Sequence, residues 1–159
     1  MSLDESNISN LQMEIEIDAS QSDVWTALTE NIGQWWPAEF YAGGESGSRT
    51  FSLEAMPGGR MMERWDNGGG VLWGTVIGVE PNVQLQVIGA TFPRWGGPAQ
   101  WFGTWELVPS GDKTLLKFSE QAIGRVSESG TREKDKGWQF LCATLKSHVE
   151  GNPPSVWAD

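Results

Sequence analysis

The sequence is poor in the residues that build disulfides, metal sites and hydrolytic triads. Its 159 residues include one cysteine, Cys142, and one histidine, His148. A single cysteine excludes an internal disulfide and is typical of a reducing compartment, so we expect a cytoplasmic protein. One cysteine and one histidine also fall short of the usual ligand set of a zinc site, so neither a metal nor a cofactor is predicted.

The local sequence context favours structural rather than catalytic roles for Cys142 and His148. Cys142 lies within a segment of helical pattern, and we interpret it as a packing residue rather than a nucleophile. His148 lies in the last turn of that segment, where we expect a surface residue near the negative end of the helix. No Ser–His–Asp or Cys–His pair is evident.

Basic residues and long apolar runs are also scarce. The chain has 11 Lys and Arg against 21 Asp and Glu, a net charge of −10. An acidic surface repels phosphate backbones, so nucleic acid is not an expected partner. No apolar run is long enough to span a membrane. The opening residues, MSLDESNISN, lack the apolar core of a signal peptide.

Tryptophan and glycine, in contrast, are abundant. The chain holds 10 tryptophans against one tyrosine, together with 20 glycines and 8 prolines. Each indole offers a large apolar face and one N–H donor, so a cluster of them suits a cavity for a flat apolar ligand. The alternative is that the rings simply fill the core. The glycines and prolines predict many turns and little long helix.

Hydrophobic periodicity predicts the order of the elements. Residues 12–17 (QMEIEI) alternate as a half-buried strand. Residues 18–30 (DASQSDVWTALTE) follow as a helix capped by Ser20, with Asp23 at the third position. Residues 31–37 (NIGQWWP) form a second short helix that Pro37 ends.

The rest of the chain divides into strands and one long helix. Short strands separated by turn residues predict an antiparallel meander over residues 49–121. Residues 132–151 then place apolar side chains at helical spacing, which predicts a long helix. We expect a flexible tail over residues 1–10, one domain over residues 11–151 and a second tail over residues 152–159.

Strand alternation predicts which side chains face inward. The inner set includes Trp65, Trp73, Trp101 and Trp105, with Glu63 among them. The same parity turns Ile77 inward and turns Gly74 and Gly78 toward the outer face, where they would allow the sheet to bend.

Symmetric turns predict two cross-strand pairs on the inner face. One pair is Trp65 with Trp73, and the other is Arg49 with Glu63. An ion pair between Arg49 and Glu63 would explain how the carboxylate tolerates burial. Glu120 shares the parity of inward residues and is expected to point inward near a sheet end.

This pattern resembles the START-like helix-grip superfamily, also called SRPBCC or Bet v 1-like, and in particular the group named after the activator of the Hsp90 ATPase. The matching pieces span roughly residues 11–150 and include no catalytic motif. They are the opening strand, DASQSDVWTALTE, WWP, GGRMMERW, WGTVIGVEP, GTWELVPSGDKTLLKF and GWQFLCATLKSHVEG.

The resemblance implies an α+β fold. A curved, seven-stranded antiparallel sheet would wrap around one long C-terminal helix, with two short helices after the first strand. A cavity would lie between sheet and helix. Many such domains bind lipids, sterols, polyketides or other apolar molecules, a few are cyclases or hydrolases, and some interact with chaperones.

The leading hypothesis is a binding module for a small apolar or aromatic ligand, such as a lipid or a polyketide-like molecule. Glu63, together with Arg49, would supply the polar anchor of an otherwise apolar site. The predicted pocket is lined by Trp36, Met61, Trp65, Trp73, Trp105, Phe118, Trp138 and Leu141.

Two alternatives come from other functional classes. A polyketide cyclase or hydrolase would use Glu63 as general acid or base, but no second catalytic group accompanies it. A protein-interaction domain, co-chaperone-like or acting in a stress response, would use Trp95 and Trp157 as contact anchors for a partner or a homodimer. Those two tryptophans are equally suited to cover the mouth of the cavity.

Overall fold

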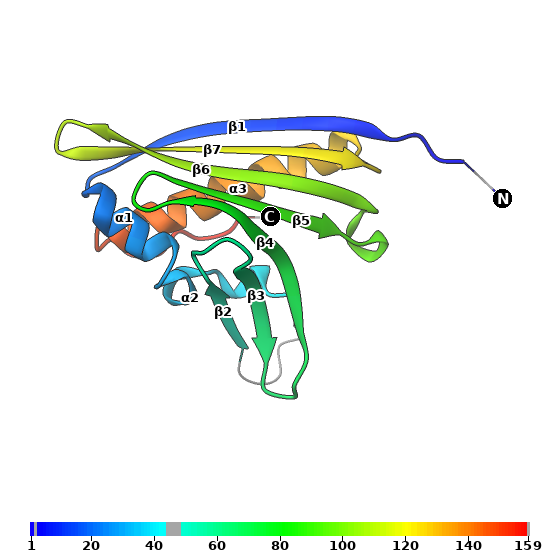
Figure 1. Cartoon of the computed structure of the whole chain (residues 1–159), viewed down its shortest axis with the longest axis horizontal. Helices are drawn as coiled ribbons and strands as arrows, with labels where there is room; N and C mark the ends of the chain where they lie inside the picture. The colour runs from blue at the N-terminus through cyan, green and yellow to red at the C-terminus, as the bar shows by residue number, and fades with distance from the viewer. Residues whose placement is uncertain (2, 44–48, 159) are drawn as a thin grey trace.

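A computed structural model describes residues 1, 3–43 and 49–158. Within them, seven antiparallel strands form one sheet in the order β1-β7-β6-β5-β4-β3-β2, and a long helix lies against its concave face (Figure 1). The strands are β1 (Asn7–Ile17), β2 (Arg49–Leu53), β3 (Arg60–Trp65), β4 (Gly70–Glu80), β5 (Gln84–Thr91), β6 (Ala99–Ser110) and β7 (Lys113–Gly124). The helices are α1 (Gln21–Leu28), α2 (Ile32–Trp35), the 3-10 turns η1 (Ala38–Phe40) and η2 (Pro93–Trp95), and α3 (Glu128–Val149). The predicted helix-grip fold is confirmed.

The short helices follow β1 as the sequence predicted. Ser20 caps α1, because its hydroxyl oxygen accepts a hydrogen bond of 3.1 Å from the backbone N–H of Asp23. The indole N–H of Trp35 donates to the carbonyl of Ala27 at 2.8 Å and ties α2 to α1. Helix α2 lies beside β2, and α1 lies beside α3 (Figure 1).

The strand β1 begins earlier than its alternation suggested. It starts at Asn7 and pairs with β7 along its whole length, from Asn7 opposite Gly124 to Ile17 opposite Thr114. The end of the segment expected as a tail is therefore part of the sheet. The first residues of β1 are mostly polar and show no hydrophobic periodicity, so the sequence pattern did not predict a strand there.

The curved sheet wraps around helix α3 (Figure 1). Leu141 and Leu145 are buried on its inner side, with Cys142 beside them. Burial raises the pKa of the Cys142 thiol to about 12, so the thiol is protonated at neutral pH and unsuited to nucleophilic attack. The interpretation of Cys142 as a packing residue agrees with this environment, and His148 lies half-buried in the last turn.

Both predicted cross-strand pairs on the inner face are wrong. In the observed register Arg49 lies opposite Trp65, and Phe51 lies opposite Glu63. The β3–β4 register shifts between Met61 and Met62, which pair with Gly74 and Leu72, so Trp73 lies at a bulge. The prediction assumed symmetric turns. The β2–β3 ladder is regular, so there the turn alone sets the partner of Arg49, whereas in the β3–β4 ladder the bulge adds a residue to one strand and moves the pairing beyond it.

Two bulges reverse the predicted faces of the β4 residues that lie between them. The first is at Trp73, and the β4–β5 register shifts again between Val76 and Gly78. Val76 is therefore completely buried, whereas Ile77, at the second bulge, is 58% exposed. The prediction that Ile77 faces inward is therefore wrong. β4 bends strongly along its length and directs β2 and β3 away from the plane of the other strands (Figure 1).

Glycines on the concave face make room for tryptophan rings. A Cβ at Gly89 would overlap the indole of Trp101, and one at Gly74 would lie 2.5 Å from Val87 and 3.2 Å from the Trp101 ring. Gly74 is buried on the inner side, contrary to the prediction that it faces outward. The Trp101 ring lies close against the backbone of its neighbouring strands because these residues lack side chains.

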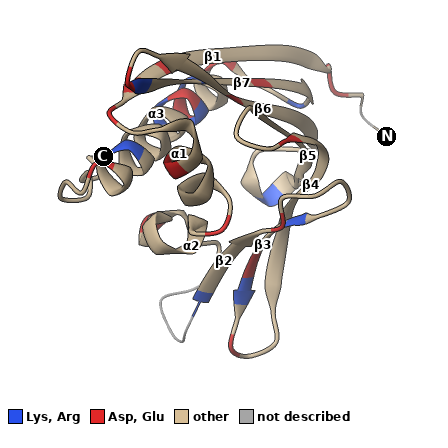
Figure 2. Cartoon of the chain, turned by 60° about the vertical axis from the view of Figure 1, so that its left-hand side comes forward, with Lys and Arg blue, Asp and Glu red and all other residues tan. Residues whose placement is uncertain are grey.

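Charged side chains occur mainly as isolated surface pairs. Lys113 and Lys117 on β7 lie 3.4 Å and 3.7 Å from Glu16 and Glu14 on β1, and all four are well exposed. Such exposed pairs contribute little, about 0–1 kcal/mol each. Figure 2 shows basic positions on β2, β3 and α3 separated from one another, with acidic positions between them.

In the part of the chain that the structure describes, no helix is long and apolar enough to cross a membrane.

Candidate functional site

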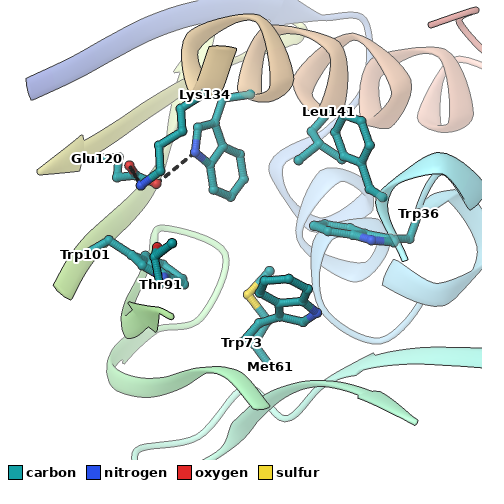
Figure 3. A pocket seen from close by; sticks show the side chains of 10 residues that line it. Trp36, Met61, Trp73, Thr91, Trp101, Glu120, Lys134 and Leu141 are labelled. Carbon is teal, nitrogen blue, oxygen red and sulfur yellow. Dashed lines mark hydrogen bonds and ion pairs between the residues drawn. The ribbon is translucent and has the colours of Figure 1, made fainter. Parts of the chain in front are cut away.

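A cavity of about 240 Å³ lies between the concave face of the sheet and α3 (Figure 3). Most of its wall is aromatic or aliphatic. The lining residues come from the segment after α2, from η1, from five strands and from α3: Trp36, Phe40, Met61, Trp73, Thr91, Trp101, Glu120, Lys134, Trp138 and Leu141.

Helical spacing brings three of these residues to one side of α3. Lys134, Trp138 and Leu141 are separated by four and three residues, so their side chains leave the helix in the same direction. All three line the cavity, and Figure 3 shows Lys134 and Leu141 reaching down from the helix. The sheet contributes the opposite wall through Met61 and Trp73.

The polar end of the cavity is an ion pair between β7 and α3. The ammonium of Lys134 donates to Oε1 of Glu120 at 3.0 Å, and the indole N–H of Trp138 donates to Oε2 at 2.9 Å (Figure 3). Glu120 is 3% exposed, while the Lys134 side chain is 31% exposed. A buried carboxylate is tolerable here because it has both an opposite charge and a second donor.

Glu63 is buried next to the cavity but does not line it. Its carboxylate accepts hydrogen bonds from the backbone N–H groups of Ala42 (2.9 Å) and Gly43 (2.8 Å). The indole N–H groups of Trp65 (2.5 Å) and Trp73 (3.3 Å) donate to the same carboxylate. Burial raises the pKa of Glu63, but these hydrogen bonds outweigh burial and hold the pKa below its usual range. Glu63 is therefore an ionised group that joins β3, β4 and the segment before β2.

Arg49 supports the same segment from the other side. Its guanidinium donates to the carbonyl of Gly43 at 2.9 Å and lies 5.1 Å from the centre of the Tyr41 ring. No ion pair joins Arg49 to Glu63 among the described residues, so the predicted charge pair is not formed. Burial, followed by the nearby charge of Glu63, raises the pKa of Tyr41.

The remaining predicted residues lie behind the cavity wall. Trp105 and Phe118 pack with their ring centroids 4.9 Å apart, and the Trp138 ring lies 5.6 Å and 4.2 Å from them. They hold Trp138 in place from the side away from the cavity. Trp65 serves as a donor to Glu63.

The cavity thus unites half of the predicted pocket residues. Trp36, Met61, Trp73, Trp138 and Leu141 line it, whereas Arg49, Glu63, Trp65, Trp105 and Phe118 do not. The prediction that Glu120 points inward is confirmed.

Sequence reasoning did not assign the other five lining residues to the pocket: Phe40, Thr91, Trp101, Glu120 and Lys134. For Trp101 and Glu120 it predicted only that they face inward. Phe40 lies in a 3-10 turn and Thr91 at the end of a strand, where no periodicity identifies a face. Lys134 had a usable signal, since it lies one helical turn before Trp138.

Trp36 is positioned by stacking. Its ring lies 3.9 Å from that of Phe51, nearly parallel to it. Its indole N–H is buried and has no hydrogen-bond partner in the described part of the chain. Ring contacts rather than hydrogen bonds therefore hold this part of the wall.

Trp95 and Trp157 pack against residues of the cavity wall. Trp95 lies 5.3 Å from Trp73, and Trp157 lies 5.3 Å from Phe40 and 5.1 Å from Phe140. Both rings are partly buried within their own chain. The alternative in which they cover the mouth of the cavity stays a prediction.

Comparison with known proteins supports the same fold. Residues 18–150 match the family described as activator of Hsp90 ATPase homolog 1-like protein. Similar solved structures include Mll3558 from Rhizobium loti, with 21% identity and a TM-score of 0.68 over 91% of this chain and 99% of that one. CalU16 from Micromonospora echinospora has 19% identity and a TM-score of 0.62 over 94% and 85% of the two chains.

A third similar structure, Ara h 8.0201, has 10% identity and a TM-score of 0.63 over 92% of this chain and 100% of its own. At such identities these structures show the fold alone. No curated protein matches the chain.

Proposed function

The chain belongs to the family of activator of Hsp90 ATPase homolog 1-like proteins, of START-like helix-grip fold, and we propose that it binds a small aromatic molecule in the cavity between sheet and α3. The observation that carries the proposal is a cavity walled by aromatic rings with a single charged end. Few directed polar groups on an apolar wall are the usual composition of a small-molecule site.

The volume limits the size of the ligand. An apolar cavity of about 150 Å³ holds one benzene ring. The cavity here, at about 240 Å³, suits a molecule of about two fused rings. The flat indole walls favour a ring system over an acyl chain, because offset and edge-to-face ring contacts contribute about 0.5–1.5 kcal/mol beyond burial.

The expected affinity is moderate. A ligand of ten heavy atoms that gains about −0.6 kcal/mol per atom, within the range for small ligands, binds with roughly −6 kcal/mol. This free energy corresponds to a Kd on the order of tens of micromolar.

Neither alternative function has an observation in its favour. The cyclase or hydrolase hypothesis relied on Glu63, whose carboxylate accepts four hydrogen bonds from the protein and does not line the cavity. The interaction hypothesis relied on Trp95 and Trp157 as free anchors, and both pack against their own chain.

The test uses the indole N–H groups as reporters. In a ¹⁵N-tryptophan-labelled sample titrated with naphthalene, the signals of the lining residues Trp73, Trp101 and Trp138 should shift and saturate. The signal of Trp25, which is buried in α1 and does not line the cavity, should not. Leu141→Phe, which fills part of the cavity, should weaken binding about tenfold. Phe102→Leu on the exposed outer face is the matched control and should bind as the wild type does. Uniform small shifts without saturation would refute the proposal.

A further inference from the structure

The charged end of the cavity offers donors and acceptors side by side. Among the lining residues only Glu120 and Lys134 carry a charge. The Lys134 ammonium has three donors and uses one on Glu120. Each oxygen of Glu120 accepts one hydrogen bond from the protein, from Lys134 or from Trp138, and a carboxylate has about four acceptor positions. Donors of Lys134 and lone pairs of Glu120 that no protein group uses therefore remain on two atoms 3.0 Å apart.

We infer that the Glu120–Lys134 pair selects aromatic ligands that carry a neutral hydroxyl group, as in a phenol. The inference rests on the proposed function and adds the ligand chemistry. A hydroxyl accepts a hydrogen bond from Lys134 and donates one to Glu120 at the same time, which matches both halves of the pair.

Other functional groups match only one half. A carboxylate would accept from Lys134 but place a second negative charge beside Glu120, which is 3% exposed. An ammonium would donate to Glu120 but place a second positive charge beside Lys134. A plain hydrocarbon would fill the aromatic part and leave the charged end unused.

The pair is held in position before any ligand arrives. The indole N–H of Trp138 holds one oxygen of Glu120, and Phe118 and Trp105 pack against the Trp138 ring. Because the carboxylate of Glu120 is already held in one conformation, it loses little conformational entropy when a ligand binds. Its hydrogen bond to the ligand therefore contributes more to the binding free energy than a bond from a mobile side chain would.

The test compares matched two-ring probes by calorimetric titration of the whole chain at neutral pH. The probes are naphthalene, 2-naphthol, 2-naphthoate and 2-naphthylmethylamine, whose amine is an ammonium at neutral pH. We expect 2-naphthol to bind about tenfold more tightly than naphthalene, which corresponds to one net hydrogen bond. The 2-naphthoate and the 2-naphthylmethylamine should bind no more tightly than naphthalene.

The variant arm removes the two charges of the pair and replaces each side chain by one of similar size. Lys134→Met keeps the aliphatic stem of the side chain but leaves the buried carboxylate of Glu120 without an opposite charge. The double variant E120Q/K134M is therefore measured as well, because it buries no charge. In the double variant the ratio of 2-naphthol affinity to naphthalene affinity should fall from about tenfold to less than twofold.

The outcomes separate the two proposals. If no probe binds, the proposed function is wrong. If naphthalene and 2-naphthol bind equally to the wild type, the cavity binds aromatics and the inference about the pair is wrong. Tighter binding of 2-naphthoate would also overturn the inference, because it would make Lys134 alone an anion site.

Discussion

Replacing Glu63 by alanine should destabilise the protein rather than alter a ligand anchor. The carboxylate is completely buried and holds four N–H groups that come from the backbone before β2 and from two tryptophans. Removing it leaves these donors without a partner in the interior, and each orphaned donor costs about 1–3 kcal/mol. The substitution also relieves the desolvation of a charge, and the donors can partly reorient toward water.

The expected net loss is about 3–5 kcal/mol of unfolding free energy, at the upper end for single substitutions. For a domain of this size each kcal/mol lowers Tm by about 2–4 °C, so the Tm should fall by roughly 6–20 °C. Glu54→Ala is the matched control, because Glu54 pairs with Arg60 at 2.8 Å on an exposed surface. It should cost less than about 1 kcal/mol.

The pH dependence provides a second, independent readout. The native pKa of Glu63 lies below its unfolded value, so its contribution to stability is complete above the unfolded value, about 4.3. The contribution is lost as the pH falls through the native pKa. The difference in unfolding free energy between wild type and Glu63→Gln should therefore shrink when the pH is lowered below about 4. Thermal and urea unfolding between pH 7 and pH 3 measure it. An unchanged Tm for Glu63→Ala, with weaker naphthalene binding, would refute a structural role and restore Glu63 as a ligand anchor.

Three further predictions concern the helix, the sheet and the C-terminal segment. Trp138→Ala should cost about 3–5 kcal/mol in urea unfolding, because the ring packs against Trp105 and Phe118; an unchanged unfolding midpoint would exclude this role. Gly89→Ala should lower the Tm and shift the indole signal of Trp101, since the added Cβ overlaps that ring; a wild-type spectrum would show that the contact is not as close as described. Removing residues 152–159 should leave the fold intact by circular dichroism and speed naphthalene dissociation, because Trp157 packs on the lining residue Phe40; loss of folded protein would instead make this segment part of the core.

The fold could be predicted because its signals are local. Alternation in residues 12–17, the cap at Ser20 and the helical spacing of residues 132–151 each depend on a few neighbouring positions. The resemblance to the helix-grip superfamily joined these pieces in the right order, and the structure confirms the arrangement. Parity also predicted correctly that Glu63 and Glu120 point inward.

The partners of those two carboxylates could not be predicted. Symmetric turns predict Arg49 as the ion-pair partner of Glu63. In the structure, the carboxylate of Glu63 instead accepts hydrogen bonds from two indole and two backbone N–H groups. Glu120 is paired with Lys134, which lies on another element. Strand parity states the face of a residue and not its neighbour, since the neighbour depends on turn geometry and bulges.

By itself, the sequence determined the elements, their order and the inward direction of the carboxylates and most tryptophans, because these properties follow from spacing along one strand or helix. Only the tertiary structure decided that Glu63 is a structural tie while Glu120 and Lys134 form the charged end of the cavity. The physical reason is that a cavity is the space that several elements leave between them. Its walls depend on bulges at Met61 and Val76 and on the depth to which each ring packs, and no spacing within a single element records these distances.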